Sequence, residues 1–527
     1  MSISPLANFS TLPPTLGLSD ILLFYFLVVP FFIFLLGSIS KFSSSSSWAS
    51  PPRVPILGSI PFIKSKHFPQ QCLDWSHQYG SIFSLKLGTS NPSLVVSGHD
   101  LAKELFIDHG YAFTGRANPF FFHPELRLDE YFTPVMNTTP HVLSQRTLIL
   151  SSTKASINSG LGNCIDRSSR LITSKLYHEA SLEPIDIRHI LLEAAAVCAI
   201  NISYGFPVVD FDKIPPEARS ILECADETFN MLQFFEEPTI AFPFLVKLLW
   251  KRTERIRKQA RKTSSKLLEA YETLFQLAKT QYEVEGPDSL ESSVIKSLFE
   301  SGGSGMSQFQ QGCLAGTTVA AAMSTTMNTI HSTLGCLAVH LDYQDQLRNE
   351  ISKIVGADQI PSSEQSALRE LPLLRAFIEE VIRMFPVFPI LSRVAEQDHV
   401  MSNGQTIHEG QVLFVNYYGI NRDSRVFRDP NAFNPYRFLE SEKKVNSYWP
   451  KYGHASFGAG RRSCPGSEFA MNLILCTISR ILHSFEIKFS DSIISPKIDL
   501  VEPVLVGVEQ HTKFPKLIFK PLEPKSY

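Results

Sequence analysis

The hydrophobic pattern of the chain begins with an uncharged apolar segment over residues 21–40, ILLFYFLVVPFFIFLLGSIS. Twenty helical residues at about 1.5 Å each span about 30 Å, the thickness of one bilayer core. Lys41 and Arg53 follow the segment, and no lysine or arginine precedes it. The positive-inside rule therefore predicts a single-pass anchor over residues 1–40 with the large C-terminal part in the cytosol. A cleaved signal peptide is the alternative, but the apolar run is long and a basic leader is missing.

After the anchor, a serine run and several prolines predict a linker over residues 41–58. The remaining residues, 59–527, form one large predicted domain, which the pattern indicates is mainly α-helical with small β-sheets. Short strands are expected at 81–88 and 93–98, and a glycine-rich loop at 300–305. Long helices are expected at 251–282, 307–340, 343–355, 367–384 and 466–484.

Composition narrows the possible classes of protein. The chain has 527 residues, of which 44% are hydrophobic, and a formal net charge of -2. This charge gives no global field that would favour nucleic acid, and the basic run at 250–262 is interpreted as the solvated face of a helix. The eight cysteines contain no CxxC spacing, so neither a disulfide framework nor a zinc site is indicated.

One cysteine stands apart because of its neighbours, in FGAGRRSCPG at residues 457–466. Glycines on both sides permit a tight loop and close approach by a flat group. Arg462 offers a fork for a carboxylate. The apolar-faced helix that follows would place the Cys464 sulfur near a positive helix end. These features predict a thiolate beside an anionic planar cofactor, without naming that cofactor.

The same loop resembles the cysteine loop of the cytochromes P450 at each fixed position of the pattern, Phe457, Gly460, Arg462, Cys464 and Gly466. Two further elements of that family follow the expected order. EEVIRMFP resembles its helical E-x-x-R pair through Glu380 and Arg383, and FNPYRF resembles its later arginine motif through Arg437. Residues three apart share a helix face, so Glu380 can hold Arg383 while Arg437 completes the network. The resemblance covers about residue 50 to the C-terminus.

The resemblance implies a P450 fold that binds haem b, with Cys464 as the proximal iron ligand. It also implies that Phe457 shields the thiolate and that Arg462, Arg393 and Arg146 bind haem propionates. The family usually has a tryptophan four residues before the arginine that corresponds to Arg146. Here Val142 occupies that position, and His141 beside it is either a substitute or a surface histidine.

The oxygen-activating helix departs from the family pattern. AAMSTT, residues 321–326, aligns Thr325 with the family's oxygen-contacting threonine and Ser324 with its carboxylate. Proton delivery would then rely on hydroxyl groups and water. AGTT at 315–318 is a competing alignment that lies farther from Glu380.

Several segments would face the substrate if the resemblance holds: the aromatic tract at 118–124, residues 234–246 and residues 386–392. They favour an apolar, membrane-partitioned small molecule of lipid, terpenoid or sterol type. The expected partner is NADPH-cytochrome P450 reductase, with cytochrome b5 as a further candidate, docking near Arg461. The expected location is the endoplasmic reticulum membrane.

The main functional hypothesis is a monooxygenase that inserts one atom of O2. Two alternatives stay open. One is a haem-thiolate isomerase or dehydratase that uses a peroxide without a reductase, and the other is a non-catalytic haem-binding protein.

Overall fold

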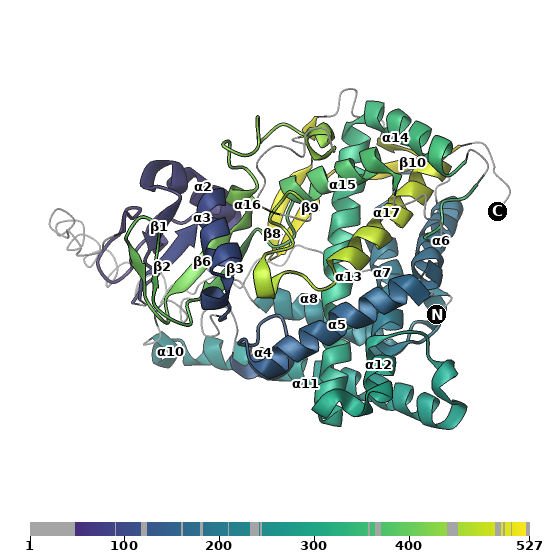
Figure 1. The fold of residues 1–527 in the computed structure, drawn as a ribbon, viewed down its shortest axis with the longest axis horizontal. Helices are drawn as coiled ribbons and strands as arrows, with labels where there is room; N and C mark the ends of the chain where they lie inside the picture. The colour runs from purple at the N-terminus through teal and green to yellow at the C-terminus, as the bar shows by residue number, and fades with distance from the viewer. Residues whose placement is uncertain are drawn as a thin grey trace.

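A computed structural model describes residues 48–522, apart from 90, 117–123, 160–161, 180–182, 209, 232–241, 243–244, 357–358, 364–369, 440–448, 450–451, 491–496, 499–500 and 507–508. Helices form most of it (Figure 1). The α-helices are α2 (Phe68–Tyr79), α3 (His99–Lys103), α4 (Leu128–Tyr131), α5 (Pro140–Ser159), α6 (Gly162–Glu179), α7 (Arg188–Tyr204), α8 (Pro216–Met231), α10 (Leu245–Leu248), α11 (Trp250–Glu285), α12 (Val294–Glu300), α13 (Gln308–Val339), α14 (Leu341–Ile354), α15 (Pro372–Met384), α16 (Tyr417–Ile420) and α17 (Ser467–Ser484).

The strands form one four-stranded sheet and three two-stranded ones. They are β1 (Ile82–Leu85), β2 (Ser93–Val96), β3 (Ile390–Val394), β4 (His399–Val400), β5 (Thr406–Ile407), β6 (Val412–Asn416), β7 (Phe485–Phe489), β8 (Glu502–Val506), β9 (Glu509–Lys513) and β10 (Leu517–Pro521). The large sheet has the order β1-β2-β6-β3, in which only β2 and β6 run parallel. The small sheets pair β7 with β10, β4 with β5, and β8 with β9.

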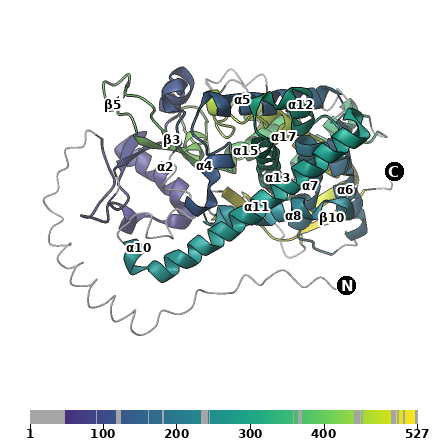
Figure 2. The same ribbon diagram turned by 90° about the horizontal axis from the view of Figure 1, so that it is seen from below.

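Helix α13 runs through the middle of the helical part, between α7, α11 and α17 (Figures 1 and 2). It begins with a capping box, in which the Ser307 hydroxyl accepts from Gln310 N–H and the Gln310 side chain accepts from Ser307 N–H. An ideal Cβ on Gly316 would lie 2.0 Å from the Tyr271 ring, so only glycine lets α11 approach α13 this closely. Twenty-five residues of α13 are buried, which explains the helix's nearly all-round apolar sequence.

The predicted helices and strands are present, with shifted ends. Helix α15 begins at Pro372, not at 367, because proline fits the first helical turn and Leu371 in front of it has a non-helical backbone, with φ -96° and ψ 76°. The predicted strand at 81–88 is shorter, Ile82–Leu85, and Gly88 beyond it has a positive φ. The glycine-rich segment is a short 3-10 turn over Gly302–Gly305.

Part of the predicted linker is fixed to the sheet. Ser84 N–H donates to Ala49 O at 2.8 Å, and Ser59 N–H donates to Lys86 O at 2.7 Å. Gly58 has a φ of 63° there, and an added Cβ would lie 2.3 Å from Lys86 O. The predicted anchor over residues 1–40 lies outside the described residues. Among the described helices, none combines the length and apolarity that crossing a bilayer requires.

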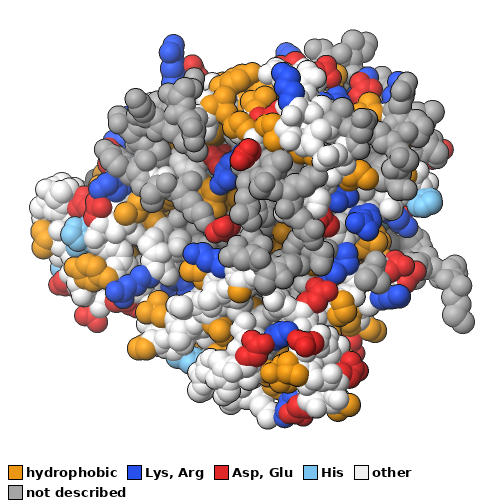
Figure 3. Space-filling model, turned by 45° about the vertical axis from the view of Figure 1, so that its right-hand side comes forward, with side chains coloured by type: hydrophobic (Ala, Val, Ile, Leu, Met, Phe, Trp, Pro, Cys, Tyr) orange, Lys and Arg blue, Asp and Glu red, His pale blue; other side chains and the backbone are white. Residues whose placement is uncertain are grey.

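On the face drawn in Figure 3, basic and acidic side chains are intermingled over the described surface. The basic run at the start of α11 is mostly exposed, as the solvated-helix interpretation expects. The described part of this face therefore carries no broad field of one sign.

Candidate active site

The cysteine loop precedes α17 and bends on its own backbone hydrogen bonds. Cys464 N–H donates to Phe457 O at 2.8 Å, and Ser463 N–H donates to Gly460 O at 3.0 Å. Seven of the eight cysteines are buried, whereas Cys464 is exposed. Since α17 begins at Ser467, the Cys464 sulfur lies by the N-terminal end of a helix, where a thiolate is favoured.

Two glycines let this loop pass close to its neighbours. Gly458 and Gly460 have φ values of 71° and 58°, which side chains rarely adopt. An added Cβ on Gly460 would lie 2.7 Å from Phe106 O, whereas one on Gly466 would meet nothing within 4 Å. Phe457 is half-buried, with its ring centroid 4.7 Å from that of Tyr452. The open side of the loop thus lies next to Cys464.

Glu380, Arg383 and Arg437 come together behind the loop. Arg383 donates two hydrogen bonds to Glu380, at 2.7 and 2.8 Å, and Arg437 Nε donates to Glu380 Oε1 at 3.2 Å. Arg383 Nη1 also donates to Asn421 O and Pro430 O at 2.9 and 2.8 Å. The network therefore joins α15 to the segment that leads to the cysteine loop.

Four arginine side chains converge beside the cysteine loop from different elements. Arg146 on α5 donates from Nε to Arg461 O at 3.3 Å and from Nη2 to Ser463 O. Arg462 donates to Thr114 O at 3.0 Å and to Met136 O at 2.5 Å. Arg393 lies on β3, and Arg116 donates to Ser392 O at 2.8 Å in the same strand. Sequence reasoning missed Arg116, for which GRAN beside the buried Phe113 was the only local signal.

These guanidinium groups are not satisfied by the protein alone. Arg116 Nε, Arg393 Nη1 and Arg462 Nη1 are buried and have no hydrogen-bond partner in the described structure. Burial, followed by repulsion from Arg393 and Arg146, lowers the pKa of Arg462 to about 9. Burial and the nearby Arg393 and Arg462 also lower the pKa of Arg116 well below its usual value.

A group with two carboxylates would satisfy the unpartnered N–H groups and relieve the repulsion. The donor set, the exposed thiol and the open space at Gly466 fit a flat dianionic group such as haem.

Helix α13 has one face that is partly exposed. Ala321, Ala322, Thr325 and Thr329 are partly exposed, whereas their neighbours along the helix are buried. Their spacing of three or four residues places them on a single face. Thr325 donates its hydroxyl hydrogen to Ala321 O at 2.8 Å.

The competing alignment lies two turns away in a buried environment. Thr317 donates to Tyr131 O at 3.2 Å, and Thr318 donates to Leu314 O at 2.9 Å. Both side chains are 7% exposed or less, and Gly316 between the helices serves packing. Thr325, unlike Thr317 and Thr318, is therefore on the accessible face.

Ser324 points elsewhere, toward a carboxylate that no local sequence pattern predicts. Its hydroxyl donates to Glu509 Oε1 at 2.9 Å, and the Glu509 residue is 1% exposed. Glu509 is the first residue of β9, and Gln510 N–H donates to Val387 O at 2.6 Å. The hairpin of β8 and β9 thus joins α13 to the segment at 386–392. Residues 118–123 of the aromatic tract and most of 234–246 lie outside the described residues.

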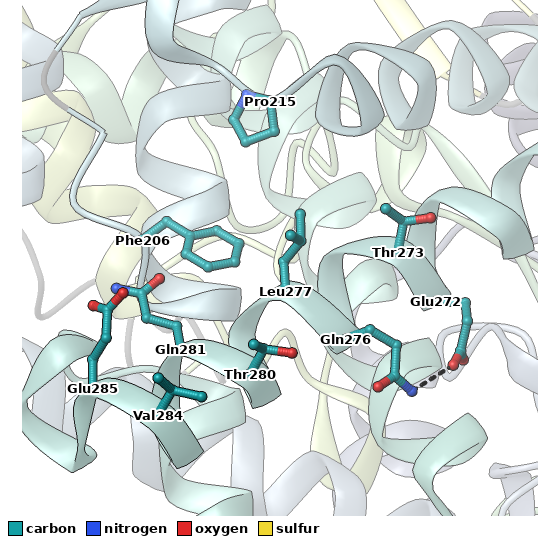
Figure 4. A pocket seen from close by; sticks show the side chains of 10 residues that line it. All are labelled: Phe206, Pro215, Glu272, Thr273, Gln276, Leu277, Thr280, Gln281, Val284 and Glu285. Carbon is teal, nitrogen blue, oxygen red and sulfur yellow. Dashed lines mark hydrogen bonds between the residues drawn. The ribbon is translucent and has the colours of Figure 1, made fainter.

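A separate groove of about 750 Å³ runs along α11, opposite Phe206 and Pro215 (Figure 4). Leu277 and Val284 on this face are 49% and 77% exposed. None of the cysteine-loop residues or the converging arginines lines this groove. It is therefore distinct from the candidate active site.

Comparison with known proteins agrees with this geometry. The cytochrome P450 family model matches residues 49–511, most of the chain. The chain belongs to the cytochrome P450 family. It is a P450-type monooxygenase, an oxidoreductase of a family that binds haem iron.

Several relatives are similar over most of their length. A geraniol 8-hydroxylase of Swertia mussotii is 24% identical, over 86% of this chain and 89% of that protein. A xanthotoxin 5-hydroxylase of Arabidopsis thaliana is 25% identical, over 95% of this chain and 98% of that protein. A solved zebra fish cytochrome P450 with progesterone has a TM-score of 0.68 at 22% identity, covering 86% of this chain and 99% of that one. The last comparison shows the shared fold.

Proposed function

We propose that this cytochrome P450 inserts one oxygen atom of O2 into an apolar, membrane-partitioned small molecule of lipid, terpenoid or sterol type. Haem b is the proposed cofactor, and NADPH-cytochrome P450 reductase is the proposed electron donor. The proposal rests on one observation: the only exposed thiol among the cysteines lies at a helix N-terminus beside four converging arginines. Haem supplies the iron at which dioxygen is activated.

The side chains of this protein have separate tasks in that reaction. Cys464 would ligate the iron, with its negative charge stabilised by the N-terminus of α17. Arg116, Arg146, Arg393 and Arg462 would hold the propionates. The hydroxyl of Thr325, on the accessible face of α13, would hold and pass protons to the reacting oxygen. Phe457 would exclude water from the sulfur.

Support for the substrate class comes from the apolar character of the segments expected to face it and from the relatives. One relative is named for geraniol, a terpenoid, and another, the ferruginol synthase of Salvia miltiorrhiza, is 26% identical over 79% of this chain. In the structure, Gln510 N–H donates to Val387 O and β9 contacts α13, so the proposed contact segment at 386–392 lies close to α13.

For location, we propose a single-pass protein of the endoplasmic reticulum membrane. Support comes from the uncharged segment at 21–40 and the positive residues after it. Arg461 is exposed beside the cysteine loop, where a reductase with an acidic surface would dock.

The test combines the absorption spectrum of the reduced carbonyl complex with the consumption of NADPH and O2. Cys464→Ser should abolish the thiolate-type spectrum of the reduced carbonyl complex, whereas Cys72→Ser, in a buried site, should retain it. With reductase, the unaltered protein should consume NADPH and O2 and form a hydroxylated product from a terpenoid panel.

Three results would contradict the proposal in different ways. Conversion of a hydroperoxide without reductase would indicate the isomerase or dehydratase. Haem binding without any turnover would indicate a non-catalytic haem protein. A Cys464→Ser protein that keeps the thiolate-type spectrum would show that another residue ligates the iron.

A further inference from the structure

Helix α13 carries no Asp, Glu, Lys or Arg between Gln308 and Val339. If the proposed function holds, the helix must deliver protons to dioxygen without a carboxylate of its own. A buried carboxylate nevertheless reaches it from another element. Glu509 accepts hydrogen bonds from Ser324 at 2.9 Å and from Asn328 Nδ2 at 3.3 Å, two side chains one helical turn apart.

His511 connects the buried Glu509 carboxylate to the protein surface. The two residues are two apart on β9, so their side chains lie on the same face of the strand. His511 Nε2 is 3.3 Å from Glu509 Oε2, and Arg188 Nη2 is 2.5 Å from His511 Nδ1. Arginine can only donate, so Nδ1 accepts and the imidazole hydrogen is on Nε2, facing the carboxylate. His511 is 13% exposed and Arg188 is partly exposed.

We propose that Glu509 is a positioning residue that supplies the carboxylate missing from α13, forming with Ser324 and His511 a proton relay from the surface to Thr325. This inference rests on the proposed monooxygenase function. Solvent first protonates His511 at Nδ1 as Arg188 moves away from that atom, and the imidazolium passes its Nε2 proton to the Glu509 carboxylate. The Glu509 carboxyl group then gives a proton to Ser324 while the Ser324 hydroxyl releases its own proton, through water, to Thr325. The neutral His511 returns its remaining hydrogen from Nδ1 to Nε2 by exchange with water. Each turn of the relay moves one proton inward and leaves every member as it began.

Two features separate this inference from a purely structural contact. Asn328, whose Nδ2 donates to Glu509, has a buried Oδ1 with no hydrogen-bond partner in the described structure, so the cluster has an acceptor available for water. In addition, Ser324 is directly adjacent to Thr325, the threonine on the accessible face of the helix. A contact that only fastened the hairpin would require neither arrangement.

The test uses the full-length, haem-loaded protein with reductase, NADPH and geraniol, an apolar terpenoid. The readout is hydrogen peroxide released per NADPH, which does not depend on whether geraniol is oxidised. With two electrons and two protons, O2 is either released as H2O2 or split into one water and one oxygen atom for insertion into the substrate. Glu509→Gln keeps the size and an acceptor for Ser324 but cannot exchange a proton. We expect O–O cleavage to slow by roughly 10²-fold and peroxide to become the main product.

A second variant distinguishes loss of the proton-transferring carboxylate from loss of a structural contact. Ser324→Asp in the Glu509→Gln background returns a carboxylate to the helix and should restore low peroxide release. Ser324→Asp alone places two carboxylates together and should raise peroxide release. The melting temperature of the haem-free Glu509→Gln protein should equal that of the unaltered protein.

Three outcomes would overturn the inference. One is unchanged peroxide release in Glu509→Gln while the unaltered protein remains coupled. Another is peroxide that rises together with a lower melting temperature and is not reduced by Ser324→Asp, which indicates a structural role. If the unaltered protein consumes no NADPH at all, the proposed function fails, and the inference fails with it.

Discussion

Arg383 donates hydrogen bonds from Nε and Nη2 to the two carboxylate oxygens of Glu380, and neither side chain has any exposed surface. The pair occupies successive turns of α15, and Arg437, 11% exposed, reaches the same carboxylate from the segment after α16. Asn434 N–H adds a fourth hydrogen bond to Glu380 at 2.8 Å. Removing this carboxylate leaves two guanidinium groups with no counter-charge from Glu380 in a largely dry environment.

Glu380→Ala should therefore lower the free energy of unfolding by about 3–5 kcal/mol, as for a buried ion pair that loses one partner. Urea denaturation of the haem-free protein measures this. Glu130→Ala is the matched control, because Glu130 and Arg127 form the same three-residue spacing with side chains 49% and 52% exposed. Its loss should be at most about 1 kcal/mol. Equal losses in the two variants would mean that Glu380 does not carry the network.

Adjacent arginines in the cysteine loop should differ sharply in haem affinity. Arg462 is 6% exposed with a buried N–H group that has no partner, whereas Arg461 is exposed. Arg462→Gln should raise the haem dissociation constant by roughly 10–10²-fold, the effect of losing one charged hydrogen bond. Arg461→Gln should leave haem binding unchanged. Haem titration followed by absorbance tests both, and a loss of affinity in both variants would point to general positive charge rather than to one aimed side chain.

Thr325→Ala should separate electron flow from product formation. Its hydroxyl lies on the accessible face of α13, and positioned proton transfer contributes roughly 10²–10⁴-fold in general. Substrate binding should be nearly unchanged, while product formed per NADPH falls and hydrogen peroxide rises. Thr317→Ala and Thr318→Ala, two turns away, should do neither. If those two release peroxide and Thr325→Ala does not, the alignment of this helix is wrong by two turns.

His331 should make the fold sensitive to acid. Burial lowers its pKa to about 4, and its ring stacks on Phe514 at a centroid distance of 4.2 Å. In the unfolded chain a histidine takes up a proton near pH 6.5, so the stability from this group is complete above 6.5 and is lost as pH falls toward 4. Between pH 6.5 and 4.5 the loss should be about 2–3 kcal/mol.

The check compares urea unfolding at both pH values. His331→Gln should lose less stability on acidification than the unaltered protein. His408→Gln, at a ring that is 72% exposed, should follow the unaltered protein. Identical acid losses in His331→Gln and the unaltered protein would show that another group controls the transition.

Local sequence patterns predict those parts of the fold and the candidate site whose contacts are made between residues close together in the chain. The Glu380 and Arg383 side chains meet because they are three residues apart on one helix, and the cysteine loop is closed by its own backbone and glycines. The start of α15 was misplaced only because Pro372 marks the first turn more strongly than the apolar pattern before it.

Contacts between segments far apart in the chain could not be predicted, because they leave no pattern in the local sequence. Glu509 meets Ser324 from 185 residues away, and Arg116 joins Arg393 through the backbone of a strand far along the chain. Neither residue differs, by its immediate neighbours, from an ordinary exposed charge. Their burial and partners follow from how β9 and β3 are placed, which depends on packing of the whole domain.

The parallel pairing of β2 with β6 also governs how this protein is made. Val95 pairs with Phe414, and the residues between them must be synthesised before the central ladder of the sheet can close. At about 5–20 residues per second, the ribosome needs roughly 15–60 s to cover that distance. During this time the apolar strand Ser93–Val96 has an unpaired edge, which is a site for strand-mediated aggregation. Slower elongation or a longer insertion between the two strands should therefore lower the yield of native protein during translation, even when the finished fold is equally stable.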